Sequence, residues 1–281
     1  MAISATHPGN DLIAAAGRCL QAGEVLDKLR LTRETYAELE AGRLVIEADT
    51  VRAVNDTPGR PSRPQLVAPR DLTRRKLSTT AGRAALLHAI AHIEFNAINL
   101  AWDAVYRFHG MPSDYYRDWA RVATEEAYHF SLLAERLAAL GFAYGDFPAH
   151  NGLWEAALDT RHDVLVRMAL VPRVLEARGL DVTPGIMARL EASGDRESVA
   201  LLEIILRDEI GHVAIGTRWF RYLCRQRDCN PDETFQNLLD RYMKGRIKGP
   251  FYYDARLKAG FSIEELQGLE SLDQSQSDEK Q

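Results

Sequence analysis

The amino-acid sequence predicts an all-α protein, in which a four-helix bundle carries additional helical segments at its N- and C-terminal ends. Four long segments place apolar residues at three- and four-residue spacing, which is the period of an amphipathic helix. Alternating strands rich in aromatic residues are scarce. A proline-rich stretch separates the N-terminal segment from the bundle, because proline cannot continue a helix.

Residues 1–72 are expected to form a helical segment followed by an extended arm. Helical periodicity runs through LIAAAGRCLQ (12–21) and RETYAELEAGRLVIEADTVRAV (33–54). Residues 56–72 hold repeated prolines, which predict a linker or an arm that lies across a surface.

Residues 73–228 are expected to form the bundle itself. Its first helix, within TAGRAALLHAIAHIEFNAINLAWDAVYRF, holds no proline and carries a continuous apolar stripe. Ser113 and Asp114 are predicted to cap the second helix, and Gly141 to end it. Pro172 favours a kink in the third helix, which GLDVTPG is expected to end before a further short helix in PGIMARLEAS. The expected helices span roughly 81–108, 114–140, 153–178 and 195–226.

Residues 229–270 are predicted to form a C-terminal helical extension. NPDETFQNLLDRYMKGR reads as one helix, and a docking segment with a short last helix follows it. The tail at 271–281 is polar and free of aromatic residues, which predicts disorder.

Composition narrows the function classes. The net charge of −5 disfavours a basic groove for nucleic acid. Three cysteines give neither a disulfide framework nor an all-cysteine zinc site, which is typical of a reducing cytoplasm. No apolar run reaches the roughly 20 residues that span a bilayer, and no signal-peptide pattern is present, so we expect a cytoplasmic protein without a membrane partner. Signatures of P-loop, dinucleotide-binding and nucleophile-elbow enzymes are missing.

Two predicted helices contain the same pattern, an acid followed by Glu-x-x-His. The first copy is Glu125-Glu126 with His129, and the second is Asp208-Glu209 with His212. Residues three apart lie on one face of a helix, so the Glu and the His of each copy can approach one metal ion.

The two remaining bundle helices each offer one further glutamate. Glu94 and Glu176 lie a similar distance, 32 and 33 residues, before Glu126 and Glu209. Most helical glutamates are solvated surface residues. Glu94 nevertheless sits in an apolar run, where a carboxylate must be paired or metal-bound to be stable. The predicted ligands of a two-metal site are Glu94, Glu126, His129, Glu176, Glu209 and His212.

These six residues resemble the ligands of the ferritin-like di-iron carboxylate proteins, which include ribonucleotide reductase small subunits, bacterial multicomponent monooxygenases and a tRNA hydroxylase. More closely, roughly residues 58–265 resemble an uncharacterised ferritin-like family of unknown function. The blocks that carry this resemblance are HAIAHIEFNAINLAWDAVYRF, YGDFPAHNGLWE, ALVPRVLEARGLDVTP and DEIGHVAIGTRWF.

The resemblance implies a cofactor of two iron ions, or of manganese and iron. It also implies that Glu125 accepts a hydrogen bond from His212, and Asp208 one from His129, which would orient each imidazole. The expected activity is oxygen-dependent oxidation or hydroxylation of a small molecule or a modified nucleoside, with an unidentified substrate and electron donor. A tRNA substrate is left open, and a monomer or small homo-oligomer is expected.

Two other function classes stay open. The same site could oxidise iron in an iron-handling protein, or it could stabilise a binding module that performs no turnover. Smaller expectations concern two histidines outside the ligand set. His92 is two residues from Glu94 and so faces elsewhere, as a buried or capping residue, and His150 is expected to stabilise a turn.

Overall fold

The computed structural model describes residues 10–47, 56–73, 75–243 and 247–278. Over these ranges the protein is all-helical and contains no β-strand beyond isolated bridges, as the sequence predicts. The chain divides into two compact units, residues 1–158 and residues 159–281. This division falls inside the segment 73–228 that was expected to form the bundle.

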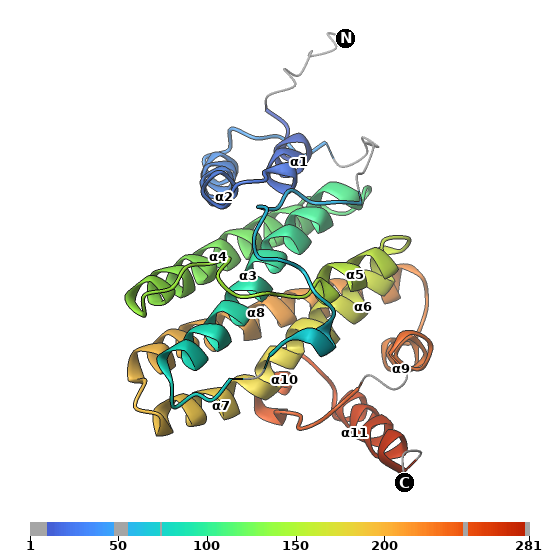
Figure 1. The fold of residues 1–281 in the computed structure, drawn as a ribbon. Coiled ribbons are helices and arrows are strands. Elements are labelled where there is room, and N and C mark those ends of the chain that lie inside the picture. Colours follow the sequence, from blue (N-terminus) through green and yellow to red (C-terminus); the bar gives the residue numbers. More distant parts are fainter. Residues whose placement is uncertain (1–9, 48–55, 74, 244–246, 279–281) are drawn as a thin grey trace. The chain divides into compact units, whose positions relative to one another are not determined.

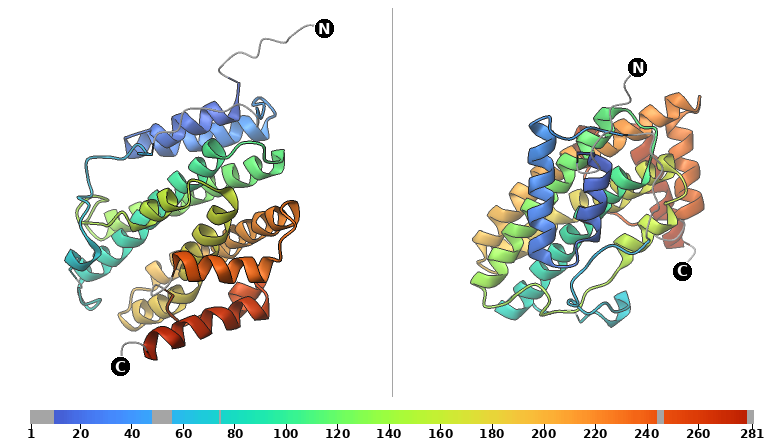
Figure 2. Two further views of the ribbon diagram at one scale, coloured as in Figure 1. Left: turned by 90° about the vertical axis from the view of Figure 1, so that its right-hand side faces the viewer. Right: turned by 90° about the horizontal axis from the view of Figure 1, so that it is seen from above.

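The N-terminal unit is built on two long helices, α3 (Thr80–Arg107) and α4 (Ser113–Ala139), which pack along each other (Figure 1). Two shorter helices cover this hairpin: α1 (Leu12–Gln21) packs on α3, and α2 (Val25–Glu40) packs on α4. Figure 2 shows α1 and α2 side by side across the hairpin. A last helix, α5 (Gly152–Asp159), follows a loop after α4.

The predicted bounds of α3 and α4 are confirmed to within one or two residues. Thr79 caps α3 by accepting a hydrogen bond from the backbone N–H of Gly82. Gly141 ends α4 with a φ of 83°, a left-handed conformation that glycine adopts without strain. The predicted N-terminal cap of α4 is wrong: Pro112 occupies the cap position without a side-chain hydrogen bond, because Ser113 already belongs to the helix.

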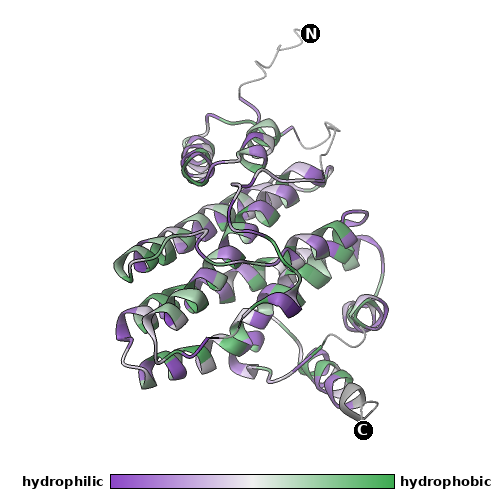
Figure 3. Ribbon diagram, viewed as in Figure 1, coloured by the Kyte–Doolittle hydropathy of each residue, from purple (hydrophilic) through white to green (hydrophobic). Residues whose placement is uncertain are grey.

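Figure 3 shows that the helices, α3 included, carry both apolar and polar residues along their length. By length and composition alone α3 could cross a membrane, but 72% of its most apolar window is buried inside the protein. Burial of this extent is typical of the core helix of a globular protein.

The proline-rich arm is extended, as expected, apart from the short 3₁₀ helix η1 (Pro69–Asp71). It lies against the loop after α4, because Val67 donates a hydrogen bond to the carbonyl of Ala149 and Ala149 donates one to Gln65, at 2.8 and 3.0 Å. The helix expected over 33–54 is wrong in its limits. It begins earlier, at Val25, and ends at Glu40 because Gly42 turns the chain with a φ of 69°, while 48–54 lie outside the described residues.

The C-terminal unit is organised around α8 (Arg196–Gln226), which was predicted over roughly 195–226. Packed on it are α6 (Val164–Leu170), the π-helical segment η2 (Val171–Glu176) and α7 (Ala177–Ala192). The unit ends with α9 (Pro231–Tyr242), α10 (Tyr253–Lys258) and α11 (Ile263–Asp278).

The third bundle helix differs most from its prediction over 153–178. The helix is interrupted between α5 and α6. A new helix begins at α6, where Asp163 caps it by accepting a hydrogen bond from the N–H of Leu165. Pro172 does produce an irregularity, the π-helical turn η2, because its ring removes a backbone donor. The expected helix end at GLDVTPG is wrong, since α7 continues through Pro184 to Ala192.

The C-terminal extension is partly as predicted. Asn230 caps α9 by accepting hydrogen bonds from the N–H groups of Asp232 and Glu233. The last helix is longer than expected: α11 continues through Asp278, so residues 271–278 of the predicted disordered tail are helical.

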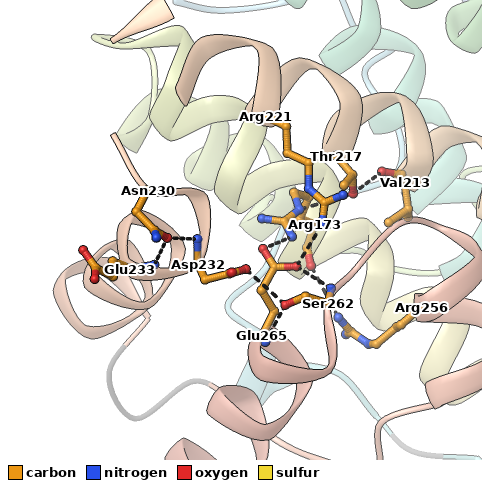
Figure 4. Close-up of polar contacts among 10 residues, drawn as sticks. All are labelled: Arg173, Val213, Thr217, Arg221, Asn230, Asp232, Glu233, Arg256, Ser262 and Glu265. Atoms are coloured by element: carbon orange, nitrogen blue, oxygen red, sulfur yellow. Dashed lines mark hydrogen bonds and ion pairs between the residues drawn. The ribbon is translucent and has the colours of Figure 1, made fainter. Parts of the chain in front are cut away.

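A buried ion pair attaches α11 to the rest of its unit (Figure 4). Arg173 of η2 donates to Glu265 of α11, and both side chains are fully buried. The Arg173 guanidinium also lies 4.1–4.6 Å from the ring centroids of Phe220, Phe235 and Phe261. Such contacts between a cation and aromatic rings offset part of the cost of removing the charge from water.

A second buried pair supports the first. Arg256 of α10 donates to both carboxylate oxygens of Asp181 on α7, at 2.9 and 2.7 Å. This pair explains why the GLDVTPG segment stays helical: Asp181 has a fixed position on the buried side of α7, and packing overrides the local glycine and proline signals.

Replacing Glu265 with alanine should lower the free energy of unfolding by about 3–5 kcal/mol, because Arg173 would be buried without its carboxylate. Urea denaturation followed by circular dichroism measures the change. The exposed neighbour Glu264 is the matched control, and its replacement with alanine should change stability by no more than about 0.5 kcal/mol. Equal effects of the two substitutions would contradict the role given to the buried pair.

Candidate metal centre

Three of the predicted ligands come together within the N-terminal unit. Glu94 extends from α3, and Glu126 and His129 from successive turns of α4. His129 Nδ1 lies 3.5 Å from Glu94 Oε2 and 3.4 Å from Glu126 Oε2. The potential ligand atoms of these three residues all lie within 4.8 Å of one another. The spacing of two helices has therefore brought two oxygens and one nitrogen to a common point.

This cluster is almost completely removed from water. Glu94 is 4% exposed, Glu126 1% and His129 0%. Burial alone lowers the pKa of His129, but the facing carboxylates of Glu126 and Glu94 outweigh it and raise the pKa to about 11. In the metal-free protein, the proton on His129 faces the carboxylates of Glu94 and Glu126. A divalent cation bound between these three side chains would take the place of that proton.

The donor set fits a metal ion of intermediate hardness. Carboxylate oxygens together with an imidazole nitrogen suit iron or manganese, whereas structural zinc favours cysteine and histidine. Residues three apart on α4 supply one oxygen and the nitrogen, and α3 supplies the second oxygen. The chain thus offers a candidate metal-binding cluster that needs no backbone movement to present its ligands.

The second copy of the motif lies in the C-terminal unit. Glu209 and His212 are buried on α8, and His212 Nδ1 lies 3.4 Å from Glu209 Oε1. This arrangement repeats the geometry of Glu126 with His129. Glu176 is the last residue of η2 and is partly exposed.

Local packing in the C-terminal unit brings Pro172 of η2 close to the side of α8 that carries these ligands. A Cβ atom on Gly216 would lie 2.4 Å from the ring of Pro172, so glycine alone permits this approach of η2 to α8. Gly216 is four residues after His212 and seven after Glu209, on the same face of α8. The short turn at 193–195 makes α7 and α8 antiparallel, so the chain from Pro172 to Glu176 runs from the level of Gly216 toward that of His212.

The two acids that precede the motifs are less buried than the motifs themselves. Glu125 lies 3.9 Å from Arg121, and Asp208 accepts a hydrogen bond from Arg207 at 2.9 Å. Their hydrogen bonds to His212 and His129, which the family resemblance implies, stay predictions.

His92 and His150 behave as expected. His92 is buried and bonds through Nδ1 to the Tyr144 hydroxyl at 2.8 Å and through Nε2 to Asn96 at 3.1 Å. His150 Nδ1 accepts from the N–H of Gly152 in the turn before α5. Asn96 and Tyr144 are not among the predicted site residues, although an asparagine within the apolar run of α3 indicates a polar site.

In metal-free protein prepared with a chelator, Glu126→Gln should lower the pKa of His129, because it removes one of the two facing carboxylates. Titration followed by NMR of the imidazole measures this pKa. Glu135→Gln, on the exposed side of α4, is the matched control and should leave it unchanged. Titration of His129 near 6.5 in the unsubstituted protein would contradict the described cluster.

The same raised pKa determines how the stability of the metal-free protein depends on pH. Because the pKa of His129 is higher in the folded than in the unfolded chain, its stabilising effect is complete below about pH 6.5 and is lost as the pH rises toward 11. Urea midpoints measured between pH 7 and 10 should fall with pH, and fall less steeply in Glu126→Gln. A metal ion must displace this proton, so metal affinity should rise over the same range.

Comparison with known proteins places the chain in a family. A family model described as "Protein of unknown function (DUF455)" matches residues 21–267. An uncharacterized protein of Haemophilus influenzae is 44% identical over 265 residues, which cover 92% of this chain and 90% of that protein. No solved structure matches the chain. In agreement with the expected membership of an uncharacterised family, the chain belongs to the DUF455 family of proteins of unknown function.

Proposed function

We propose that this protein is a ferritin-like, oxygen-dependent oxidoreductase with a two-metal centre. The observation that carries the proposal is the convergence of Glu94, Glu126 and His129, three buried side chains whose ligand atoms lie within 4.8 Å of one another. Buried carboxylates that face one imidazole are rare unless they pair with charges or hold a metal.

The repetition of this arrangement supports two metal ions. Glu209 and His212 repeat the Glu–His geometry of α4 on α8, and η2 brings Glu176 toward the same face of α8. The chain thus carries one Glu–His pair in each unit, and we infer that each pair contributes to binding one metal ion. The π-helical turn that ends at Glu176 supports a functional role, because such turns are frequent at functional sites.

We propose iron as the metal, as a pair of irons or as iron with manganese, because the four carboxylates and two imidazoles of the set suit these ions. When bound, a pair of ferrous ions would supply electrons for the reduction of dioxygen. The residues of the chain would balance the metal charge, hold the imidazole nitrogens in position and exclude water. The substrate would be a small molecule or a modified nucleoside, and an unidentified electron donor would restore the reduced metals.

Elemental analysis of purified protein tests the centre. We expect two metal ions per chain, with loss of metal in Glu126→Ala and in Glu209→Ala, one variant from each unit. The matched controls are Glu135→Ala on α4 and Glu203→Ala on α8, since both glutamates are exposed on the same helices. Full metal content in both ligand variants, or no metal in the unsubstituted protein after reconstitution with ferrous iron, would overturn the proposal.

Oxygen consumption tests the reaction. With a chemical reductant in excess, the iron-loaded protein should consume oxygen continuously, and Glu126→Ala should reduce the rate at least 100-fold. A single round of oxygen uptake, followed by accumulation of ferric iron that the reductant does not recycle, would favour the iron-handling alternative. Absence of oxygen uptake with two irons bound would favour a metal-stabilised binding module.

A further inference from the structure

We propose that a second site, in the N-terminal unit and separate from the metal centre, binds a small planar acid that carries an N–H or O–H group. The site is a pocket of about 210 Å³ between α3 and the proline-rich arm, here called the arm pocket. Its polar lining includes Arg60, His92, Asn96, Asn99, Tyr144 and Asn151.

The arm pocket and the metal ligands use opposite sides of α3. A helix turns by roughly 100° per residue, so His92, Asn96 and Asn99 lie roughly 140–160° around α3 from Glu94. The arm pocket is therefore separate from the predicted metal ligands and from the Glu-x-x-His motifs. The inference does not depend on the proposed function.

Asn99 is the side chain that points to a ligand. It is 1% exposed, lines the arm pocket, and its Oδ1 accepts no hydrogen bond from the part of the chain that the structure describes. A buried acceptor without a donor is uncommon in folded proteins. A molecule in the arm pocket that presents an N–H or O–H group would supply the donor.

The other polar groups of the pocket are held in place by the protein itself. His92 bonds to the Tyr144 hydroxyl, and Asn96 Nδ2 donates to the His92 carbonyl at 2.9 Å. Burial raises the pKa of Tyr144, so its hydroxyl is neutral near pH 7. Because these side chains are already held in place, binding a polar molecule costs them little conformational entropy.

The charges at the pocket favour an acid. Arg60 is exposed on the arm, and its positive charge opposes the rise in the pKa of Tyr144. The lining also includes the carboxylate of Asp56, but Arg107 pairs with that group at 3.1 Å. Arg60 is therefore available to bind a carboxylate, which guanidinium groups bind through two hydrogen bonds.

Aromatic side chains favour a flat ligand of limited size. Phe95, Tyr144 and Trp154 line the pocket, and the ring centroids of Phe95 and Tyr144 lie 5.7 Å apart. Trp154 is fixed by a hydrogen bond from its indole N–H to the carbonyl of Asp56. A pocket of about 210 Å³ is smaller than the sites that hold drug-sized molecules, so a single ring with one acid group matches its size.

Binding of 4-hydroxybenzoate and pyrrole-2-carboxylate to the full-length protein, measured by isothermal titration calorimetry, tests the proposal. Both carry a ring, a carboxylate and an O–H or N–H donor. Benzoate, which lacks the donor, and phenol, which lacks the carboxylate, should each bind at least tenfold more weakly than 4-hydroxybenzoate.

Two variants assign the contacts. Asn99→Leu should abolish the preference for 4-hydroxybenzoate over benzoate, and Arg60→Gln should abolish its preference over phenol. Arg63→Gln, an exposed arginine of the same arm, is the matched control and should change neither preference. If Asn99→Leu does not fold, Asn99→Asp keeps the size of the side chain and should weaken binding of both acids through charge repulsion.

The outcomes separate this site from the metal centre. Glu126→Ala should leave binding of 4-hydroxybenzoate unchanged, even where it removes metal and oxygen uptake. Absence of saturable binding for both acids at 5 mM would overturn the proposal, as would binding that Arg60→Gln and the Asn99 variants leave unchanged.

Discussion

A carboxylate inside a helical protein must face a positive charge, and this requirement shapes both compact units. In the N-terminal unit, Glu94 and Glu126 face the protonated imidazole of His129. In the C-terminal unit, Glu265 faces Arg173 within a ring of phenylalanines. The two positive groups differ in their chemistry. The guanidinium of Arg173 is permanently charged, so it serves to hold α11 in place. The imidazole of His129 can release its proton, and a metal ion can then bind where the proton was.

This difference separates structural from functional burial of charge. Arg173 and Glu265 balance each other's charge, and three phenylalanine rings pack around the guanidinium. The cluster of Glu94, Glu126 and His129 instead brings two carboxylates to one imidazole, whose ligand atoms lie within 4.8 Å of one another. Two carboxylates and an imidazole that converge in a dry interior form a donor set suited to a metal ion, which supports the proposed metal centre.

Helical periodicity was sufficient to predict α3, α4 and α8, because it depends on spacing along single helices. The proximity of Glu94 to His129 also followed, because α3 and α4 pack along each other as the predicted hairpin. Two errors had the opposite origin. The end predicted at GLDVTPG rests on local glycine and proline signals, but Asp181 is held by Arg256, 75 residues later in the chain. The arm pocket was missed because Arg60, Asn99 and Tyr144 meet only when the arm folds back over α3.

α3 connects these observations, because it is buried on nearly every side and yet carries polar residues on two opposite ones. An apolar residue at each of these positions would pack more favourably, so the polar residues need another reason to be there. Glu94 faces His129, and Asn96 forms a hydrogen bond with His92. Oδ1 of Asn99, in contrast, has no hydrogen-bond donor among the described residues. Departures from local packing rules that nothing in the fold offsets are expected where a protein binds something else, and this reasoning leads from one core helix to two separate sites.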